Sequence, residues 1–319
     1  MKKISIVTGC YNEEENVALL IKKVQETMSL FPQYRYEHIF IDNASEDKTV
    51  EVLKSIAKND KRIKIIVNSR NFGHIRSPIY ALLQARGDAV ISIVADLQDP
   101  PEMIADFIRQ WEAGSDIVLA IKRSSKENKL MFKIREYYYH LLDTLSEVPV
   151  FKNFTGFGLY DKKVMDALRQ MKDPYPFFRG MIAEVGYTVT KIPYDQPVRI
   201  HGITKNNFYT LYDIGILGII NNSKIPLRIA TFISLILGVL SFFVGLGYLI
   251  VKLIYWDEMS LGIAPLLIGA SFAFSILLFF IGILGEYIGM IYTQVLNRPL
   301  VFEKERINFK NDDDEKQQH

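Results

Sequence analysis

Residues 89–102 read AVISIVADLQDPPE, and the order of residue types in this stretch indicates the class of fold. Its first six residues are mostly apolar and predict a buried strand. Polar side chains follow at Asp96, Gln98 and Asp99. Pro100-Pro101 then suits the first turn of a helix, where proline is tolerated. A strand, an acidic loop and a helix in succession form the repeating unit of an α/β protein.

The same unit recurs on both sides of this stretch. Further strands are predicted at Ile4–Val7, His38–Ile41, Ile63–Val67 and Ile117–Ala120, with helices at Glu14–Met28, Val50–Ala57 and Pro78–Ala85 between the first four strands. Strands that alternate with helices favour a mostly parallel sheet covered on both faces.

Polar residues stand directly after four of the predicted strands. Besides Asp96 and Gln98, these residues are Tyr11, Asn12, Glu13, Asp42, Asn43, Asn68, Ser69 and Arg70. Ligands of open α/β sheets bind at the carboxyl ends of the strands. Acidic side chains at that edge suit Mg²⁺ or Mn²⁺, which prefer oxygen ligands and often hold a diphosphate. We therefore expect a nucleotide-activated substrate.

Other classes of protein lack support in the sequence. No G-x-G-x-x-G motif follows the first strand and no G-x-x-x-x-G-K-[ST] motif is present, which argues against a dinucleotide fold and an NTPase. No Cys/His cluster indicates zinc. The formal net charge of +2 predicts no nucleic-acid partner, and the single Cys10 excludes an internal disulfide and fits a reducing compartment.

Two long uncharged segments follow the α/β pattern. Ile229–Val251 has 23 residues without a charge, and Met259–Gly285 has 27. A helix rises about 1.5 Å per residue, so either segment is long enough to cross a hydrocarbon core of about 30 Å. The sequence therefore predicts two transmembrane helices.

Charged residues beside these segments indicate their orientation. Basic residues flank the outer ends (Lys224, Arg228, Arg298, Lys304, Arg306 and Lys310), whereas Asp257 and Glu258 lie between the segments. By the positive-inside rule both termini lie in the cytoplasm. Met1-Lys2-Lys3 leads into only five strand-like residues, which does not fit a signal peptide. We expect a multi-pass protein of the cytoplasmic (inner) membrane with its catalytic domain in the cytoplasm.

Five motifs together resemble a known family. They are VTGCYNEEEN at 7–16, IDNASEDKT at 41–49, SRNFGH at 69–74, DLQDPPE at 96–102, and LGEYIGMIY at 284–292 with Arg298-Pro299. In this order they resemble family-2 glycosyltransferases of the polyprenyl-phosphate group, which includes bactoprenol glucosyltransferases and dolichol-phosphate mannose synthases.

The resemblance implies a GT-A (nucleotide-diphospho-sugar transferase) domain and an inverting transfer of one sugar from a nucleotide diphosphate to a polyprenyl phosphate of the undecaprenyl type, for a cell-envelope glycan. It implies that Tyr11, Glu13 and Asp42, together with Arg70, bind the nucleotide. It also implies that Asp96 is catalytic and, with Gln98, holds Mg²⁺ or Mn²⁺.

Some positions depart from the family pattern. Val94 replaces the first aspartate of the D-x-D motif, Asn43 replaces the second aspartate of DDGS, and Gly156 and Gly158 replace an acid and an arginine. These departures leave open a catalytically weakened membrane scaffold of the same fold. A processive polysaccharide synthase is a further alternative, although 196–200 lacks the tryptophan of its Q-x-x-R-W motif.

The acceptor side is expected among basic residues near the membrane. Arg123 follows the fifth strand and opens a basic run that includes Lys126, and Arg199 and Lys205 fall in a segment resembling the family's RxxGxSK loop. We expect Arg123 to act at the reacting groups, and Lys126, Arg199 and Lys205 to hold the acceptor phosphate.

The chain is divided into four predicted regions. A GT-A domain at 1–205 precedes an interfacial amphipathic helix at 206–225, a two-helix anchor at 226–295 and a cytoplasmic tail at 296–319. The sequence leaves open the sugar, the downstream glycan and whether the chain forms a homo-oligomer.

Overall fold

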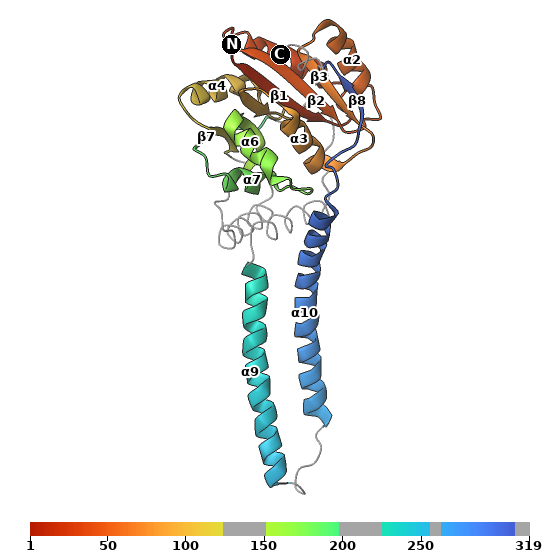
Figure 1. The fold of residues 1–319 in the computed structure, drawn as a ribbon, viewed down its shortest axis with the longest axis vertical. Helices are drawn as coiled ribbons and strands as arrows, with labels where there is room; N and C mark the ends of the chain where they lie inside the picture. The colour runs from red at the N-terminus through yellow and green to blue at the C-terminus, as the bar shows by residue number, and fades with distance from the viewer. Residues whose placement is uncertain (124–150, 198–224, 256–262, 310–319) are drawn as a thin grey trace, which may run out of the picture.

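A computed structural model describes residues 1–123, 151–197, 225–255 and 263–309 of the chain. An α/β domain lies at one end of the molecule, and two long helices extend from it (Figure 1). The domain is built on one eight-stranded sheet with the order β7-β5-β6-β4-β1-β2-β3-β8.

Six of the eight strands run in the same direction. The strands are β1 (Lys3–Cys10), β2 (Arg35–Asp42), β3 (Ile63–Asn68), β4 (Ala89–Ser92), β5 (Ile117–Lys122), β6 (Phe154–Asp161), β7 (Val189–Tyr194) and β8 (Glu303–Ile307). Strand β6 is antiparallel to both β4 and β5, and β8 is antiparallel to β3. The mostly parallel α/β sheet predicted from the sequence is confirmed. Strands β1 to β5 therefore end at one edge of the sheet.

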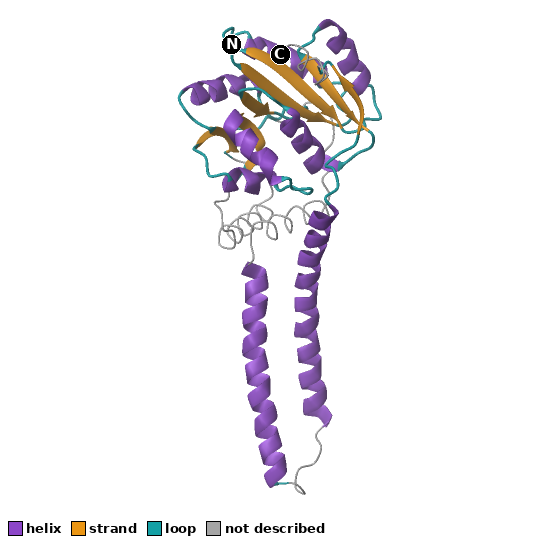
Figure 2. Cartoon of the chain, viewed as in Figure 1, coloured by secondary structure: helices purple, strands orange, loops and turns teal. Residues whose placement is uncertain are grey.

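Helices cover both faces of the sheet, as Figure 2 shows. One apolar core includes residues of α1 (Val17–Met28), α2 (Thr49–Asn59) and α4 (Ile104–Glu112), the last preceded by the short 3-10 helix η1 (Pro101–Met103). The other core includes residues of α3 (Gly73–Gln84), α6 (Lys162–Met171) and α7 (Phe178–Glu184). Burial on both faces explains why the central strands are nearly continuous apolar runs.

Helix α3 begins five residues earlier than the sequence analysis expected. The expected start was Pro78, but the helix begins at Gly73 and contains Pro78 in its interior. A proline removes one intrahelical hydrogen bond, so a helix is usually expected to begin there rather than to continue through it. Pro78 packs on β1, where a Cβ at Gly9 would lie 3.0 Å from Pro78 Cγ. Glycine at position 9 thus allows the close contact.

One buried histidine makes folding sensitive to acid. His38 on β2 is fully buried, its Nε2 lies 2.9 Å from Thr8 Oγ1, and its ring centroid lies 4.1 Å from that of Phe40. Burial lowers the pKa of His38 to about 3. The unfolded chain therefore binds a proton on this residue at a higher pH than the folded chain does.

We expect His38 to reduce stability as pH falls from about 6.5 toward 3, with a slope of up to about 1.4 kcal/mol per pH unit. His38→Gln should remove that part of the slope. The measurement is the free energy of unfolding of the full chain in detergent micelles across this pH range. Parallel pH profiles for the two proteins would contradict the assignment.

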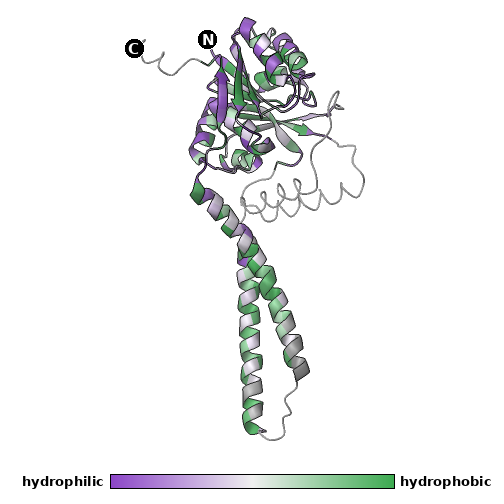
Figure 3. Cartoon of the chain, turned by 90° about the vertical axis from the view of Figure 1, so that its right-hand side faces the viewer, coloured by the Kyte–Doolittle hydropathy of each residue, from purple (hydrophilic) through white to green (hydrophobic). Residues whose placement is uncertain are grey.

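The two long helices are apolar over most of their length. Helix α9 spans Ile225–Ile254 and α10 spans Ile263–Leu296, and each contains a segment long and apolar enough to cross a membrane, Leu227–Gly247 and Phe272–Leu296. Large side chains such as Phe242 are exposed along them, and Figure 3 shows their mostly hydrophobic colouring. Water is a poor solvent for such a surface, so the helices indicate membrane association.

The predicted segment Met259–Gly285 overlaps α10 over Ile263–Gly285. The helix continues past Glu286 to Leu296.

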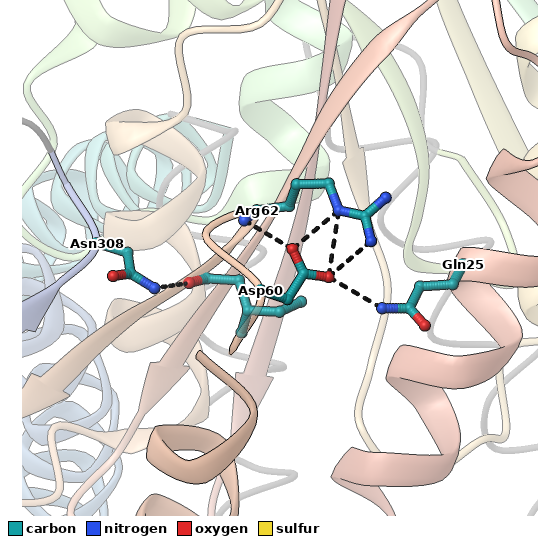
Figure 4. A network of polar contacts seen from close by, with 5 residues as sticks. Gln25, Asp60, Arg62 and Asn308 are labelled. Carbon is teal, nitrogen blue, oxygen red and sulfur yellow. Dashed lines mark hydrogen bonds and ion pairs between the residues drawn. The ribbon is translucent and has the colours of Figure 1, made fainter. Parts of the chain in front are cut away.

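After α10 the chain returns to the sheet. Residues 296–319 were expected to form a tail, but Glu303–Ile307 forms β8 on the edge of β3. Asn308 Nδ2 donates to the carbonyl oxygens of Ala57 and Ile63, each at 2.8 Å. Figure 4 shows this contact beside the ion pair of Asp60 and Arg62. The membrane-proximal end of α10 is therefore tied to the α/β domain.

Candidate active site

The loops that follow β1 and β2 are held together by backbone-to-side-chain hydrogen bonds. Ser45 Oγ accepts from Asn12 N at 2.9 Å, and Asn12 Oδ1 accepts from Glu46 N at 2.8 Å. Glu13 N donates to Thr49 Oγ1 at 2.8 Å. The structure thus brings the loop that carries Tyr11 and Glu13 against the loop that begins at Asp42.

Asp42, the last residue of β2, holds the loop that follows this strand through hydrogen bonds to Ser45. Its carboxylate is fully buried and accepts hydrogen bonds from the backbone N–H of Ser45, at 2.9 Å, and from the Ser45 hydroxyl. Burial raises the pKa of Asp42, while the bonds from Ser45 act in the opposite direction. A ligand that approaches Asp42 must therefore compete with Ser45 for the carboxylate.

Asn43 organises the third loop, after β3. Its Nδ2 donates to Asn71 Oδ1 at 2.9 Å and to Gly73 O at 3.2 Å, and its Oδ1 accepts from Phe72 N at 2.9 Å. A carboxylate could not donate to either acceptor. The asparagine that departs from the family's aspartate therefore fits its contacts, a role that the sequence analysis did not foresee.

The acidic loop after β4 forms a tight turn. Gln98 N donates to Asp96 Oδ1 at 3.1 Å, and Leu97 between them has φ of 59°. A branched side chain seldom adopts positive φ, so the loop conformation is imposed by its surroundings. Asp96 is only 8% exposed.

Asp99 is engaged by the protein itself. Its Oδ1 accepts from the Tyr194 hydroxyl at 3.1 Å and its Oδ2 accepts from Val94 N at 3.3 Å. Burial is the main cause that raises the pKa of Asp99 to about 6. Asp99 thus fixes the loop around Asp96, and Tyr194 is a site residue that no sequence motif revealed.

Arg123 lies at the same edge of the sheet as Asp96. Strands β4 and β5 point in one direction because both are antiparallel to β6. Arg123 N donates to Tyr194 O at 2.9 Å, and Arg123 Nη1 lies 3.7 Å from Asp195 Oδ2. Tyr194 therefore connects Arg123 to the Asp96–Asp99 loop through its carbonyl oxygen on one side and its hydroxyl on the other.

Backbone geometry explains the two glycines on β6. Gly156 has φ of +105°, a conformation that side chains disfavour. A Cβ at Gly158 would lie 2.4 Å from Val118 O, so no larger residue fits this backbone. An arginine at position 158 is thus excluded by this backbone, whereas an acid at position 156 would have space but a strained conformation.

The acids at this edge are few. Within the described ranges no group of three or more His, Cys, Asp or Glu residues is placed to hold a metal ion. Mg²⁺ is commonly held by one or two carboxylates and completes its coordination with substrate phosphates. The carboxylate of Asp96 and the amide oxygen of Gln98 fit such a site, whereas Asp99 already accepts bonds on both oxygens.

Part of the expected acceptor side lies outside the described residues. This applies to Lys126, Arg199, Lys205 and the predicted interfacial helix at 206–225 up to residue 224. Arg70 is described, and its Cζ lies 4.0 Å from the centroid of the Phe72 ring.

Several proteins of known family resemble this chain over most of its length. The SfII prophage-derived bactoprenol glucosyl transferase of Shigella flexneri is 36% identical over 93% of this chain and 96% of its own length. The prophage bactoprenol glucosyl transferase homolog of Escherichia coli is 35% identical over 93% of this chain and 97% of its own.

Solved structures resemble the fold at lower identity. The mannosyltransferase PcManGT from Pyrobaculum calidifontis, in complex with GDP-Man and Mn²⁺, gives a TM-score of 0.45 at 15% identity and covers 93% of this chain and 87% of its own. Mannosyl-3-phosphoglycerate synthase from Rubrobacter xylanophilus gives 0.46 at 15% identity, covering 69% of this chain and 72% of its own.

The family match agrees with the motifs at the strand ends. The family model "Glycosyl transferase family 2" matches residues 5–169, which contain β1 to β6 and the Asp42 and Asp96 loops. The predicted GT-A domain is confirmed by this match. The matched segment covers more than half of the chain, and the Shigella flexneri relative is 36% identical to it over 93% of its length. The chain therefore belongs to glycosyl transferase family 2.

Proposed function

We propose that this glycosyltransferase moves a single sugar from a nucleotide diphosphate to a polyprenyl phosphate in the membrane. The observation that carries the proposal is the 36% identity, over 93% of this chain, to a relative named as a bactoprenol glucosyl transferase. The acidic edge of the sheet supports the donor, and the two apolar helices support a lipid acceptor.

The residues at the sheet edge divide into three roles. Tyr11, Glu13 and Asp42 bind the base and ribose, and Asp96 and Gln98 would hold Mg²⁺ or Mn²⁺. When bound, the cation offsets the negative charge that develops on the leaving diphosphate. Arg123 binds the acceptor phosphate beside the donor.

The same proposal gives the arrangement in the membrane. The domain at 1–205 and the tail at 296–319 face the cytoplasm, and the helices within 226–295 anchor the chain in the inner membrane. Arg228 before the first apolar segment and Arg298 after the second agree with positive charge on the cytoplasmic side. The helix at 206–225 would lie along the membrane surface and guide the lipid to Arg123, with Lys126, Arg199 and Lys205 nearby.

A catalytically weakened scaffold is the second candidate, and Val94 favours it. Val94 is 43% exposed where the family pattern has an aspartate, so one metal ligand of the pattern is absent. The two candidates differ in turnover, which one experiment measures.

The test is to incubate membranes that contain the full chain with undecaprenyl phosphate and a panel of radiolabelled sugar nucleotides. If the protein is the proposed transferase, one sugar nucleotide of the panel should give a labelled lipid, and the reaction should require Mg²⁺ or Mn²⁺. Nucleotide binding without any labelled lipid, across the whole panel and with both cations, would favour the scaffold instead.

Asp42→Ala should weaken binding of the nucleoside diphosphate by roughly tenfold to a hundredfold, because it removes charge-assisted hydrogen bonds. Metal affinity should change much less. Calorimetry with UDP and GDP measures both effects. Ser45→Ala is the matched control, since it removes one bond to Asp42 but keeps the carboxylate. Normal nucleotide affinity in Asp42→Ala would refute the role.

A further inference from the structure

Three arginines gather where α3 begins and α10 ends. The Cζ atoms of Arg70 and Arg76 lie 4.0 Å and 5.6 Å from the centroid of the same Phe72 ring. Arg76 Nη2 donates to Pro299 O at 2.6 Å, which places its guanidinium beside the backbone that follows Arg298. The loop after β3, the first turn of α3 and the exit from α10 thus each contribute one arginine.

The three-arginine cluster carries a local excess of positive charge, although the carboxylate of Asp173 lines the same cavity as Arg298. Among the described residues no carboxylate forms an ion pair with Arg70, Arg76 or Arg298. The Nε atom of Arg76 is buried and has no hydrogen-bond partner. Burial lowers the pKa of Arg76, and the charges of Arg70 and Arg298 lower it further.

Helix α3 adds to the positive potential. Its N-terminus carries partial positive charge from the backbone, which an acidic side chain in the first turn would normally offset. The first turn of α3 contains no acid and instead includes Arg76. An anion at this point would satisfy the buried Nε and balance the cluster.

An apolar cavity adjoins the cluster. It has a volume of about 240 Å³ and lies between α3, α6, α7 and the segment after α10. Its apolar lining includes Ile79, Leu83, Leu168 and Met181. Arg298, Lys172 and Asp173 also line it, and Asp173 Oδ1 accepts hydrogen bonds from Tyr175 N and Gln294 Nε2. The apolar segment of α10 ends at Leu296, two residues before Arg298, so the cavity lies close in sequence to the end of that segment.

We propose that this site binds an anionic phospholipid of the bilayer, with the headgroup phosphate among Arg70, Arg76 and Arg298 and part of one acyl chain in the apolar cavity. Guanidinium groups hold phosphate through paired hydrogen bonds, and the cavity removes apolar chain from water. Anionic lipids are abundant on the cytoplasmic leaflet, where the basic flanks place this end of α10. The inference concerns binding alone and does not rest on sugar transfer.

The bound lipid would act together with β8 to fix the domain against the membrane. Strand β8 already ties the chain after α10 to β3, and Tyr80 on α3 donates to Glu303 Oε1 at 2.7 Å. A phosphate shared by α3 and Arg298 would strengthen the same junction from the bilayer side.

The test uses the full chain in micelles of an uncharged detergent, titrated with a fluorescent phosphatidylglycerol. Phosphatidylcholine with the same chains is the charge control. Each basic residue near an anionic surface contributes enough to change affinity about fivefold, so the double variant Arg70→Gln/Arg298→Gln should bind phosphatidylglycerol at least about tenfold more weakly. Arg35→Gln is the matched control, because Arg35 is exposed at the opposite edge of the sheet, where β2 begins.

A second variant tests the cavity without a change of charge. Leu83→Trp fills space beside Leu168 and should weaken binding of long-chain phosphatidylglycerol while sparing its short-chain, water-soluble form. Near-UV circular dichroism of each variant shows whether the fold is kept.

Four results of these lipid titrations would overturn the proposal. These are equal affinity for the two phospholipids, unchanged affinity in the double variant, an equal loss in Arg35→Gln, and full displacement of phosphatidylglycerol by an equimolar amount of undecaprenyl phosphate. The last result would assign the site to the acceptor. A loss of UDP binding in Arg70→Gln with phosphatidylglycerol binding intact would return Arg70 to the donor site and also overturn the cluster.

Discussion

Asp96→Asn is expected to abolish sugar transfer, with a fall in turnover on the order of a thousandfold or more. Asp96 is the carboxylate expected to hold the cation, and Val94 cannot replace it because its side chain has no oxygen. Asparagine has nearly the same shape and keeps an oxygen that can accept from Gln98 N. The variant should therefore fold normally and lose mainly the negative charge.

Turnover of Asp96→Asn is measured as labelled polyprenyl product at saturating Mg²⁺ and Mn²⁺. Asp106→Asn is the matched control, because it removes an exposed carboxylate on α4 whose partner is Arg109. Its turnover should equal that of the native chain. Unchanged turnover in Asp96→Asn would mean that the cation is held elsewhere or is not required.

The gathering of polar residues at one edge of the sheet was predictable from sequence because it follows from local rules. Apolar runs give the strands, and polar residues directly after them must meet at one edge when the strands are parallel. Within their own loops, Asp42 accepts a hydrogen bond from Ser45 N and Asp96 accepts one from Gln98 N. The residue types next to each strand end were therefore sufficient to predict which polar side chains gather at this edge.

Contacts between distant segments were not predictable in the same way. Tyr194 reaches Asp99 across 95 positions of the sequence, and nothing near either residue indicates the pair. Strand β8 was missed because Glu303–Ile307 is mostly charged, and an edge strand needs few apolar residues. The apolar cavity beside Arg298 likewise forms only where the segment after α10 meets α3, α6 and α7.

The departures at β6 show where a motif comparison reaches its limit. Gly158 suggested a lost functional residue when only the sequence was considered. The structure shows that Val118 O would lie 2.4 Å from any Cβ there, so the glycine is required by packing between β5 and β6. A weakened enzyme is therefore not indicated by Gly158, and Val94 is the departure that favours it.

Arg123→Ala is expected to raise the Michaelis constant for the polyprenyl phosphate by about tenfold to a hundredfold, with nucleotide affinity little changed. Arg123 follows β5 at the edge that carries the nucleotide loops, and its side chain is 60% exposed. Its contact to Asp195, at 3.7 Å, is an exposed ion pair, which contributes little to stability. The guanidinium is thus available to a phosphate at small cost to the fold.

Two further variants separate an acceptor role from a structural one. Arg123→Lys should restore the acceptor constant only in part, because lysine lacks the planar fork that grips phosphate with two parallel bonds. Asp195→Asn removes the carboxylate partner while Arg123 remains, so its acceptor constant should not rise. Initial rates over a range of undecaprenyl phosphate concentrations, with UDP affinity measured separately, distinguish the cases. If Arg123→Ala weakens nucleotide binding and leaves the acceptor constant unchanged, Arg123 belongs to the donor site, and the acceptor phosphate must be bound by other basic residues.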